Sequence, residues 1–185
     1  MTDLILLAAG ASRRFGKQKL LELFQGKPLY RYAFDAAAQL ENVRVLAVTR
    51  AGLLDSAAAA YGFETVLVPE HRGAGISVAA GAAAARPEAE LCFFVCDQPY
   101  VTGADLRQFL AGFHQSGKPL GRMRAGSRCG SPTIFAPRFH DALMALTGDE
   151  GGRSIFRGRE ADIYYHNVPP RLLEDFDTPW DENGG

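Results

Sequence analysis

Residues 4–19 read LILLAAGASRRFGKQK, and this stretch decides the fold class. An apolar run passes into small residues and then into a loop with four cations, which are Arg13, Arg14, Lys17 and Lys19. This pattern is typical of a buried strand whose end meets a negatively charged ligand. The rest of the chain indicates which ligand that is.

Apolar or β-branched runs recur along the sequence and predict strands at 4–9, 43–49, 64–69, 91–97, 131–136 and 161–168. Helix-type segments are found at 27–40, 102–113 and 137–148, and Thr102 with Asp105 predicts a capping box. Strand and helix alternate through the first two thirds, which predicts a three-layer α/β/α, Rossmann-like fold with a mainly parallel sheet. In such sheets ligands bind beyond the carboxyl ends of the strands.

Composition limits the function classes. The 185 residues predict one domain over 1–185, with 47% hydrophobic and 22% charged residues. A net charge of -1 gives no basic field for nucleic acid or for a membrane surface, so we expect neither as a partner. Three cysteines, an odd and sparse number, together with no signal-type start, favour a reducing cytoplasm.

Two familiar phosphate motifs do not match the first loop. A P-loop requires four residues between its glycines, whereas Gly10 and Gly16 are separated by five, and Gln18 stands where a metal-binding hydroxyl is needed. A dinucleotide fingerprint requires a second glycine where Ser12 stands, which disfavours an NAD-dependent oxidoreductase. The loop is nevertheless suited to a polyphosphate, because its small residues admit a ligand and its cations neutralise charge. The competing interpretation is a solvated surface turn.

Carboxylates stand at two positions where a hard cation could bind. Asp97 directly follows the apolar run 91–96, and a carboxylate at a strand end is well placed to hold Mg²⁺. Asp177, in the segment DFDTPWD, is a candidate second ligand. Both could instead cap a turn or helix. Cys92 and Cys96 lie inside an apolar run and are expected in the core.

Three further segments are candidates for ligand contact. Ser77 is expected near the start of an alanine-rich helix, where N–H groups favour a phosphate or a base carbonyl. The segment RAGSRCGSPTIF carries Arg124 and Arg128 into a strand, and TGDEGGRSIF carries Asp149 and Arg153. Both of the latter segments could line an acceptor pocket.

The motifs LAAGASRRFGKQKLL, HRGAGISVAAG, CDQP, RCGSPTIF, GDEGGRSI and DFDTPWD occur in an order that resembles MobA-like nucleotidyltransferases, and within them the molybdenum cofactor cytidylyltransferases. The resemblance spans residues 4–181. It implies a nucleotide-diphospho-sugar transferase fold and transfer of CMP from CTP to a molybdopterin-type phosphorylated acceptor, with release of pyrophosphate. It also implies Mg²⁺, with Mn²⁺ as an alternative, and a molybdoenzyme maturation partner.

The resemblance also implies roles for individual residues. Arg13, Lys19 and Asp97 are the expected catalytic residues, with Asp97 and Asp177 as metal ligands. The expected nucleotide contacts are Leu7, Ala8, Ala9, Gly10, Arg13, Lys19, Gly75 and Ser77. The expected acceptor contacts are Ser131, Pro132, Asp149 and Arg153.

Several alternatives stay open at this point. The compact FGKQK leaves Lys17 and Lys19 as competitors for the triphosphate. LAAG favours the cytidylyl branch over a GTP-dependent molybdopterin guanylyltransferase, while sugar-phosphate and methylerythritol-type transferases are further alternatives. A non-catalytic nucleotide sensor or cofactor-insertion partner is a different class, and the presence of Lys19 and Asp97 disfavours it.

Overall fold

The apolar run that opens the chain lies inside the central sheet of the computed structural model, which describes residues 1–12, 15–69 and 73–176. The sheet strands are β1 (Thr2–Leu7), β4 (Arg44–Thr49), β5 (Glu64–Leu67), β6 (Glu90–Val95), β7 (Leu120–Ala125), β8 (Arg128–Phe135) and β9 (Ile163–Asn167). A small ribbon pairs β2 (Leu23–Phe24) with β3 (Lys27–Pro28). The helices are α1 (Tyr30–Ala37), α2 (Asp55–Ala60), α3 (Ala74–Ala84), α4 (Gly103–Ser116), α5 (His140–Met144) and α6 (Arg153–Phe156). Short 3₁₀ helices span Lys19–Leu21, Pro137–Phe139, Glu160–Asp162 and Pro170–Leu173.

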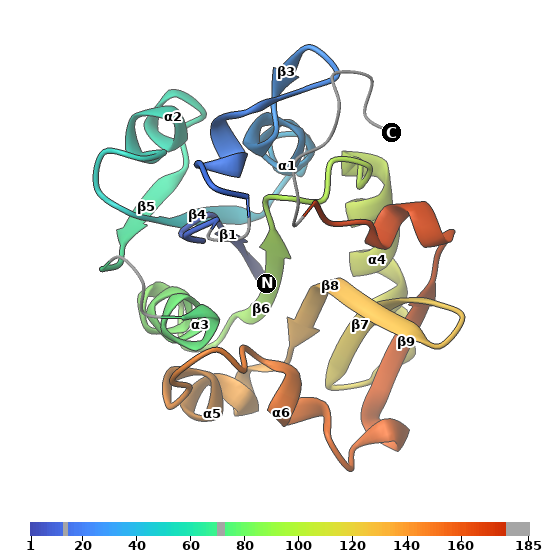
Figure 1. The fold of residues 1–185 in the computed structure, drawn as a ribbon. Coiled ribbons are helices and arrows are strands. Elements are labelled where there is room, and N and C mark those ends of the chain that lie inside the picture. The colour runs from blue at the N-terminus through green and yellow to red at the C-terminus, as the bar shows by residue number, and fades with distance from the viewer. Residues whose placement is uncertain (13–14, 70–72, 177–185) are drawn as a thin grey trace.

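The described strands of the sheet follow the order β5-β4-β1-β6-β8-β7-β9 (Figure 1). Four of the six pairings are parallel, and only β8 runs antiparallel to its neighbours β6 and β7. One hydrophobic core joins α1, α2 and α4 to one face of the sheet, and a second joins α3, α5 and α6 to the other. The three-layer, mainly parallel α/β fold expected from the sequence is confirmed. No helix in the described ranges is long and apolar enough to cross a membrane.

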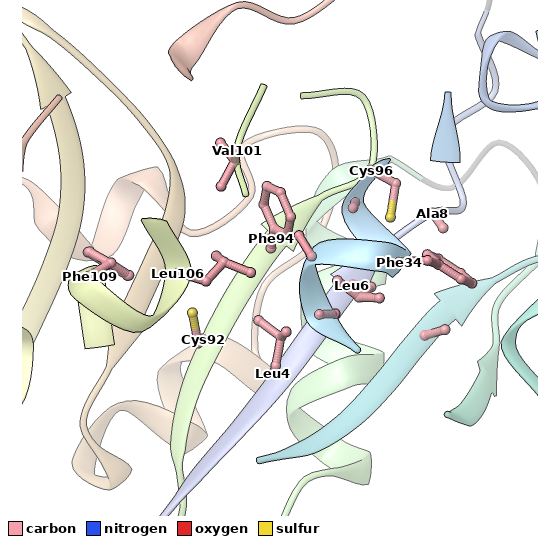
Figure 2. Packing of buried hydrophobic residues seen from close by; sticks show 14 of the residues in the cluster. Leu4, Leu6, Ala8, Phe34, Cys92, Phe94, Cys96, Val101, Leu106 and Phe109 are labelled. Atoms are coloured by element: carbon pink, nitrogen blue, oxygen red, sulfur yellow. The ribbon is translucent and has the colours of Figure 1, made fainter. Parts of the chain in front are cut away.

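The central strands supply both cores at once. Along β1, Leu4 and Leu6 enter the first core while Ile5 enters the second. Figure 2 shows Leu4 and Leu6 beside Cys92 and Phe94 of β6, in the first core. Because successive side chains of a strand point to opposite faces, a strand covered on both sides needs apolar residues at every position. This explains why the sequence of these strands hardly alternates.

The alanine-rich helix α3 packs closely on the sheet because Gly81 faces it. A Cβ at this position would lie 2.6 Å from Cγ2 of Ile5 and 3.2 Å from Cγ2 of Val48. Small residues therefore set the distance between this helix and β1. On the other side of the sheet, α4 begins with the predicted capping box, in which Thr102 and Asp105 bond each other's backbone N–H.

Differences from the sequence prediction include β7, the extent of α1 and the segment 137–148. Strand β7 was not predicted, because its sequence LGRMRA interrupts the apolar run with glycine and arginine; it pairs antiparallel with β8. The helix expected over 27–40 is limited to α1, since Lys27–Pro28 pairs with β2 instead. The helix expected over 137–148 begins as a 3₁₀ turn at Pro137, and its α-helical part ends at Met144.

The strand register brings three carboxyl ends together. Leu7 at the end of β1 pairs with Val48 of β4 and with Val95 of β6. The segments that follow these strands therefore emerge at the same edge of the sheet, where ligands bind in open α/β folds.

Candidate active site

The loop after β1 is held in shape by Gln18. Its Nε2 donates to the carbonyl of Gly10 at 3.2 Å, and its Oε1 accepts from the hydroxyl of Ser12 at 2.9 Å. The Ser12 hydroxyl in turn accepts from the backbone N–H of Lys19 at 3.1 Å. Phe15 is buried and anchors the loop to the body of the protein. This role is not visible in the sequence, where Gln18 is only a mismatch to the P-loop pattern.

Lys19 meets Asp97 at the edge of the sheet. The Lys19 ammonium lies 2.7 Å from Oδ2 of Asp97 and 3.0 Å from the carbonyl oxygen of Phe176. The two side chains are only 12% and 18% exposed, so solvent screens this ion pair weakly. Three distant parts of the chain thus converge on one ammonium group.

Lys17 occupies a different environment. Its side chain is 62% exposed and forms an ion pair with Glu22 on the same short segment. An exposed pair of this kind contributes little to stability. Of the two lysines that compete in the sequence, Lys19 is the one that faces Asp97.

A cleft of about 730 Å³ opens where these residues meet. Its lining comes from the loop after β1, the first turn of α3, the end of β6 and the turn at 148–149. The lining residues that the sequence analysis had selected are Leu7, Ala9, Gly10, Lys19, Ser77, Asp97 and Asp149. Ala8 lies beneath the cleft, fully buried, with its N–H bonded to the carbonyl of Val48 at 2.8 Å.

The first turn of α3 is pressed against the turn at 147–149. A Cβ on Gly75 would lie 2.6 Å from the carbonyl oxygen of Thr147, and one on Gly73 would lie 2.4 Å from that of Gly148. The N–H of Gly75 already donates to the Gly148 carbonyl at 2.8 Å. These glycines therefore admit a neighbouring backbone, and the exposed cleft wall on this helix is formed by Ala74, Ile76 and Ser77.

The expected acceptor residues do not share one location. Asp149 lines the cleft, whereas Ser131 and Pro132 lie on β8 and Arg153 is exposed at the start of α6. The Ser131 hydroxyl accepts from the backbone N–H of Val95 at 3.1 Å, next to the cleft. Arg13 and Asp177 lie outside the described residues.

Asp97 retains an unsatisfied oxygen. Its Oδ1 is buried and has no hydrogen-bond partner among the described residues, while Oδ2 bonds Lys19. The neighbouring Cys96 thiol is buried in the core below the cleft, and this burial, with the charge of Asp97, holds its pKa well above the usual value. The thiol is therefore protonated and is not a nucleophile, and Cys92 and Cys96 are both core residues, as the sequence predicts.

A known protein family matches most of the chain. A family model described as a MobA-like NTP transferase domain matches residues 4–164. A search of curated proteins finds no match.

Similar solved structures cover nearly the whole chain. The crystal structure of Rv0371c from Mycobacterium tuberculosis H37Rv has a TM-score of 0.81 and 24% identity, covering 98% of this chain and 95% of that one. A complex of Rv0371C with manganese, from the same organism, has a TM-score of 0.77 and 22% identity, covering 98% and 95%. The CMP:2-keto-3-deoxy-manno-octonic acid synthetase complexed with CTP has a TM-score of 0.74 and 13% identity, covering 97% and 94%. These structures share the fold of the chain, which is that of the nucleotide-diphospho-sugar transferases.

Proposed function

Because the chain belongs to the MobA-like NTP transferase family, we propose that it transfers CMP from CTP to a molybdopterin-type phosphorylated acceptor. One observation carries the proposal: Lys19 and Asp97 meet inside a cleft whose floor is made of the small residues that follow β1. A cation and a carboxylate beside a floor of small side chains suit a nucleoside triphosphate with its counter-ion.

The reaction needs no protein nucleophile. A phosphate oxygen of the acceptor attacks the α-phosphorus of the nucleotide and forms a new P–O bond. The bond between the α-phosphorus and the bridging oxygen to the β-phosphorus breaks, and pyrophosphate leaves. Catalysis then consists of positioning and charge neutralisation, with Lys19 holding the triphosphate and the cleft floor at 7–10 orienting the nucleoside.

The residues present fit a divalent cation. Asp97 offers the buried Oδ1, a hard oxygen ligand with no other partner among the described residues. No group of three or more metal-ligating side chains occurs in the described ranges. Mg²⁺ commonly binds through one or two carboxylates plus substrate phosphates, so a small protein ligand set is sufficient. A bound Mg²⁺ or Mn²⁺ would neutralise charge on the triphosphate, with Asp177 as the proposed second ligand.

The choice of CTP rests on two supports. The sequence LAAG resembles the cytidylyl branch, and the similar synthetase structure contains CTP. GTP and a sugar-phosphate-type acceptor are the competing substrates, and both would use the same cleft. The experiment must therefore identify the nucleotide base and the acceptor.

The test is calorimetric titration of the protein with CTP, GTP, ATP and UTP, each with Mg²⁺ and again with Mn²⁺. We expect CTP to bind at least tenfold more tightly than the others. Pyrophosphate release with CTP and molybdopterin should then follow, and CDP in place of CTP is the matched control without a pyrophosphate leaving group. Tighter binding of GTP would indicate a guanylyltransferase instead of a cytidylyltransferase. Absence of binding by all four nucleotides would overturn it.

A further inference from the structure

Two arginines on β7 lie on the face of the sheet that also carries the cleft. Arg122 pairs with Thr133 of β8 and Tyr165 of β9, and Arg124 pairs with Cys129 and Asn167. Paired residues on neighbouring strands share a face. Tyr165 packs against the core under α3, α5 and α6, so both arginines project on that side of the sheet.

Aromatic rings hold both guanidinium groups in place. The Cζ of Arg122 lies 4.7 Å from the ring centroid of Phe156 in α6, and the Cζ of Arg124 lies 4.4 Å from that of Tyr165. The Nε of Arg124 also donates to Oδ1 of Asn167 at 3.0 Å. A guanidinium stacked in this way keeps its planar edge available for a ligand and loses little freedom on binding.

Neither arginine has a carboxylate partner among the described residues. Arg86 and Arg128, by contrast, pair with Asp3 and Asp175. Positions i and i+2 of a strand are about 7 Å apart, so the two charges repel each other. In addition, the Nε of Arg122 is buried and finds no acceptor within residues 1–12, 15–69 and 73–176. Within the part of the chain that the structure describes, no carboxylate therefore compensates this cationic pair.

The pair is connected to the cleft through β8. Phe93 of β6, Thr133 of β8 and Arg122 form one row across the sheet. Further along the same strands, the N–H of Val95, which lines the cleft, donates to the hydroxyl of Ser131. Strands lie about 4.8 Å apart, so β7 is about 10 Å from β6, the strand that leads to Asp97.

We propose that Arg122 and Arg124 bind a non-reacting anionic group of the acceptor, a phosphate or a carboxylate, about 10 Å from β6, the strand that leads to Asp97. A planar fork recognises either group in a bidentate manner. The acceptor then carries at least two anionic groups, the attacking phosphate at the cleft and one held on β7. This inference deepens the proposed function and rests on it for the identity of the ligand as the acceptor.

The test observes the two guanidinium groups directly in protein labelled with ¹⁵N-arginine. The Nε–H of Arg122 is buried and that of Arg124 is hydrogen-bonded, so both should give slowly exchanging NMR signals. We expect inorganic phosphate to shift both signals saturably, whereas chloride at equal ionic strength does not. Arg122→Gln should weaken the phosphate response of Arg124 at least tenfold, and Arg124→Gln that of Arg122.

The matched control is Arg138→Gln, which removes another arginine that lies over an aromatic ring, 5.3 Å from Phe139 and outside the cleft. It should leave the phosphate response unchanged. If the glutamine variants fail to fold, Arg124→Lys takes their place. It keeps the positive charge but removes the planar guanidinium, and it should weaken the phosphate response of Arg122 severalfold. A response that does not saturate, or that survives in all three β7 variants, would overturn the proposal.

Kinetics separate this inference from the proposed function. In Arg124→Gln we expect the KM for the acceptor to rise at least tenfold while the KM for CTP is unchanged. If no nucleotide binds but the phosphate response is present, the proposed function fails and the anion site stands, with a different ligand. If transfer occurs with an unchanged acceptor KM in Arg124→Gln, only the assignment to the acceptor fails.

Discussion

The ammonium of Lys19 lies 2.7 Å from Oδ2 of Asp97, although 78 positions separate the two residues in the chain. The contact joins the loop after β1 to the end of β6, two strands that are neighbours in the sheet. It places the ammonium group of Lys19 beside the carboxylate that we propose as a metal ligand. A triphosphate with its metal ion would therefore meet both charges at one point.

The two lysines of the loop should differ in their effect on nucleotide binding. Lys19→Ala removes a shielded cation from the cleft and should weaken CTP binding about 10–100-fold, since a charge-assisted hydrogen bond contributes about 1.5–3 kcal/mol. Lys17→Ala is the matched control, because this exposed side chain pairs with Glu22, and it should change the affinity less than about threefold. Calorimetric titration measures both. Equal losses in the two variants would show that the loop, rather than Lys19, attracts the phosphates.

Asp97→Asn tests the proposed metal ligand. The amide keeps the shape but lacks the negative charge, so we expect transfer to fall at least about 100-fold. The loss should be accompanied by a higher Mg²⁺ concentration for half-maximal rate. Thermal unfolding should show that the fold is retained. A variant with full activity and unchanged Mg²⁺ dependence would remove Asp97 from the proposed mechanism.

The sequence was sufficient to predict the central strands and their shared edge. Runs such as 91–96 are apolar at nearly every position, which predicts a strand covered on both faces. Once β1 and β6 are parallel neighbours, the residues that follow them must lie together. The sequence therefore marks Asp97 and the loop around Lys19 as candidates at strand ends, and the pairing of β1 with β6 in the structure brings them together.

Other features could not be read from the sequence, because they depend on contacts between distant segments. Strand β7 alternates arginine with small or apolar residues, and its pairing with β8 and β9 stabilises it as a strand. Gly73 and Gly75 look like phosphate-loop glycines, yet the atoms that approach them belong to the turn at 147–149. The sequence around these two glycines does not predict that the turn at 147–149 packs against them. The bridging role of Gln18 likewise appears only once the loop is folded.

Asp3 should be important for the stability of the fold, although it does not line the cleft. This carboxylate is fully buried and accepts from the backbone N–H of Arg86 at 2.9 Å and from its Nε at 2.9 Å. The Nη2 of Arg86 also donates to this carboxylate, and the guanidinium of Arg44 adds a fourth donor at 3.4 Å. Asp3→Ala should lower the free energy of unfolding by about 3 kcal/mol, because buried donors lose their acceptor.

Chemical denaturation measures this loss. Asp175→Asn is the control, since Asp175 pairs with Arg128 at the surface and its removal should change stability by less than about 1 kcal/mol. The NTP affinity of Asp3→Ala should be close to that of the unmodified protein while it is folded. A loss of affinity without a loss of stability would contradict a purely structural role for Asp3.

The three thiols should separate into one accessible group and two protected ones. Cys92 and Cys96 are 0% and 1% exposed in the first hydrophobic core, and burial raises the pKa of Cys92 well above its usual range. Cys129, on β8, is partly exposed. Since thiol reagents attack only a thiolate that they can reach, native protein should react with one equivalent of Ellman's reagent, and unfolded protein with three. Cys129→Ser should remove the native reaction entirely. Rapid reaction of a second thiol in the native protein would mean that the core between α1, α4 and the sheet opens far more readily than its packing indicates.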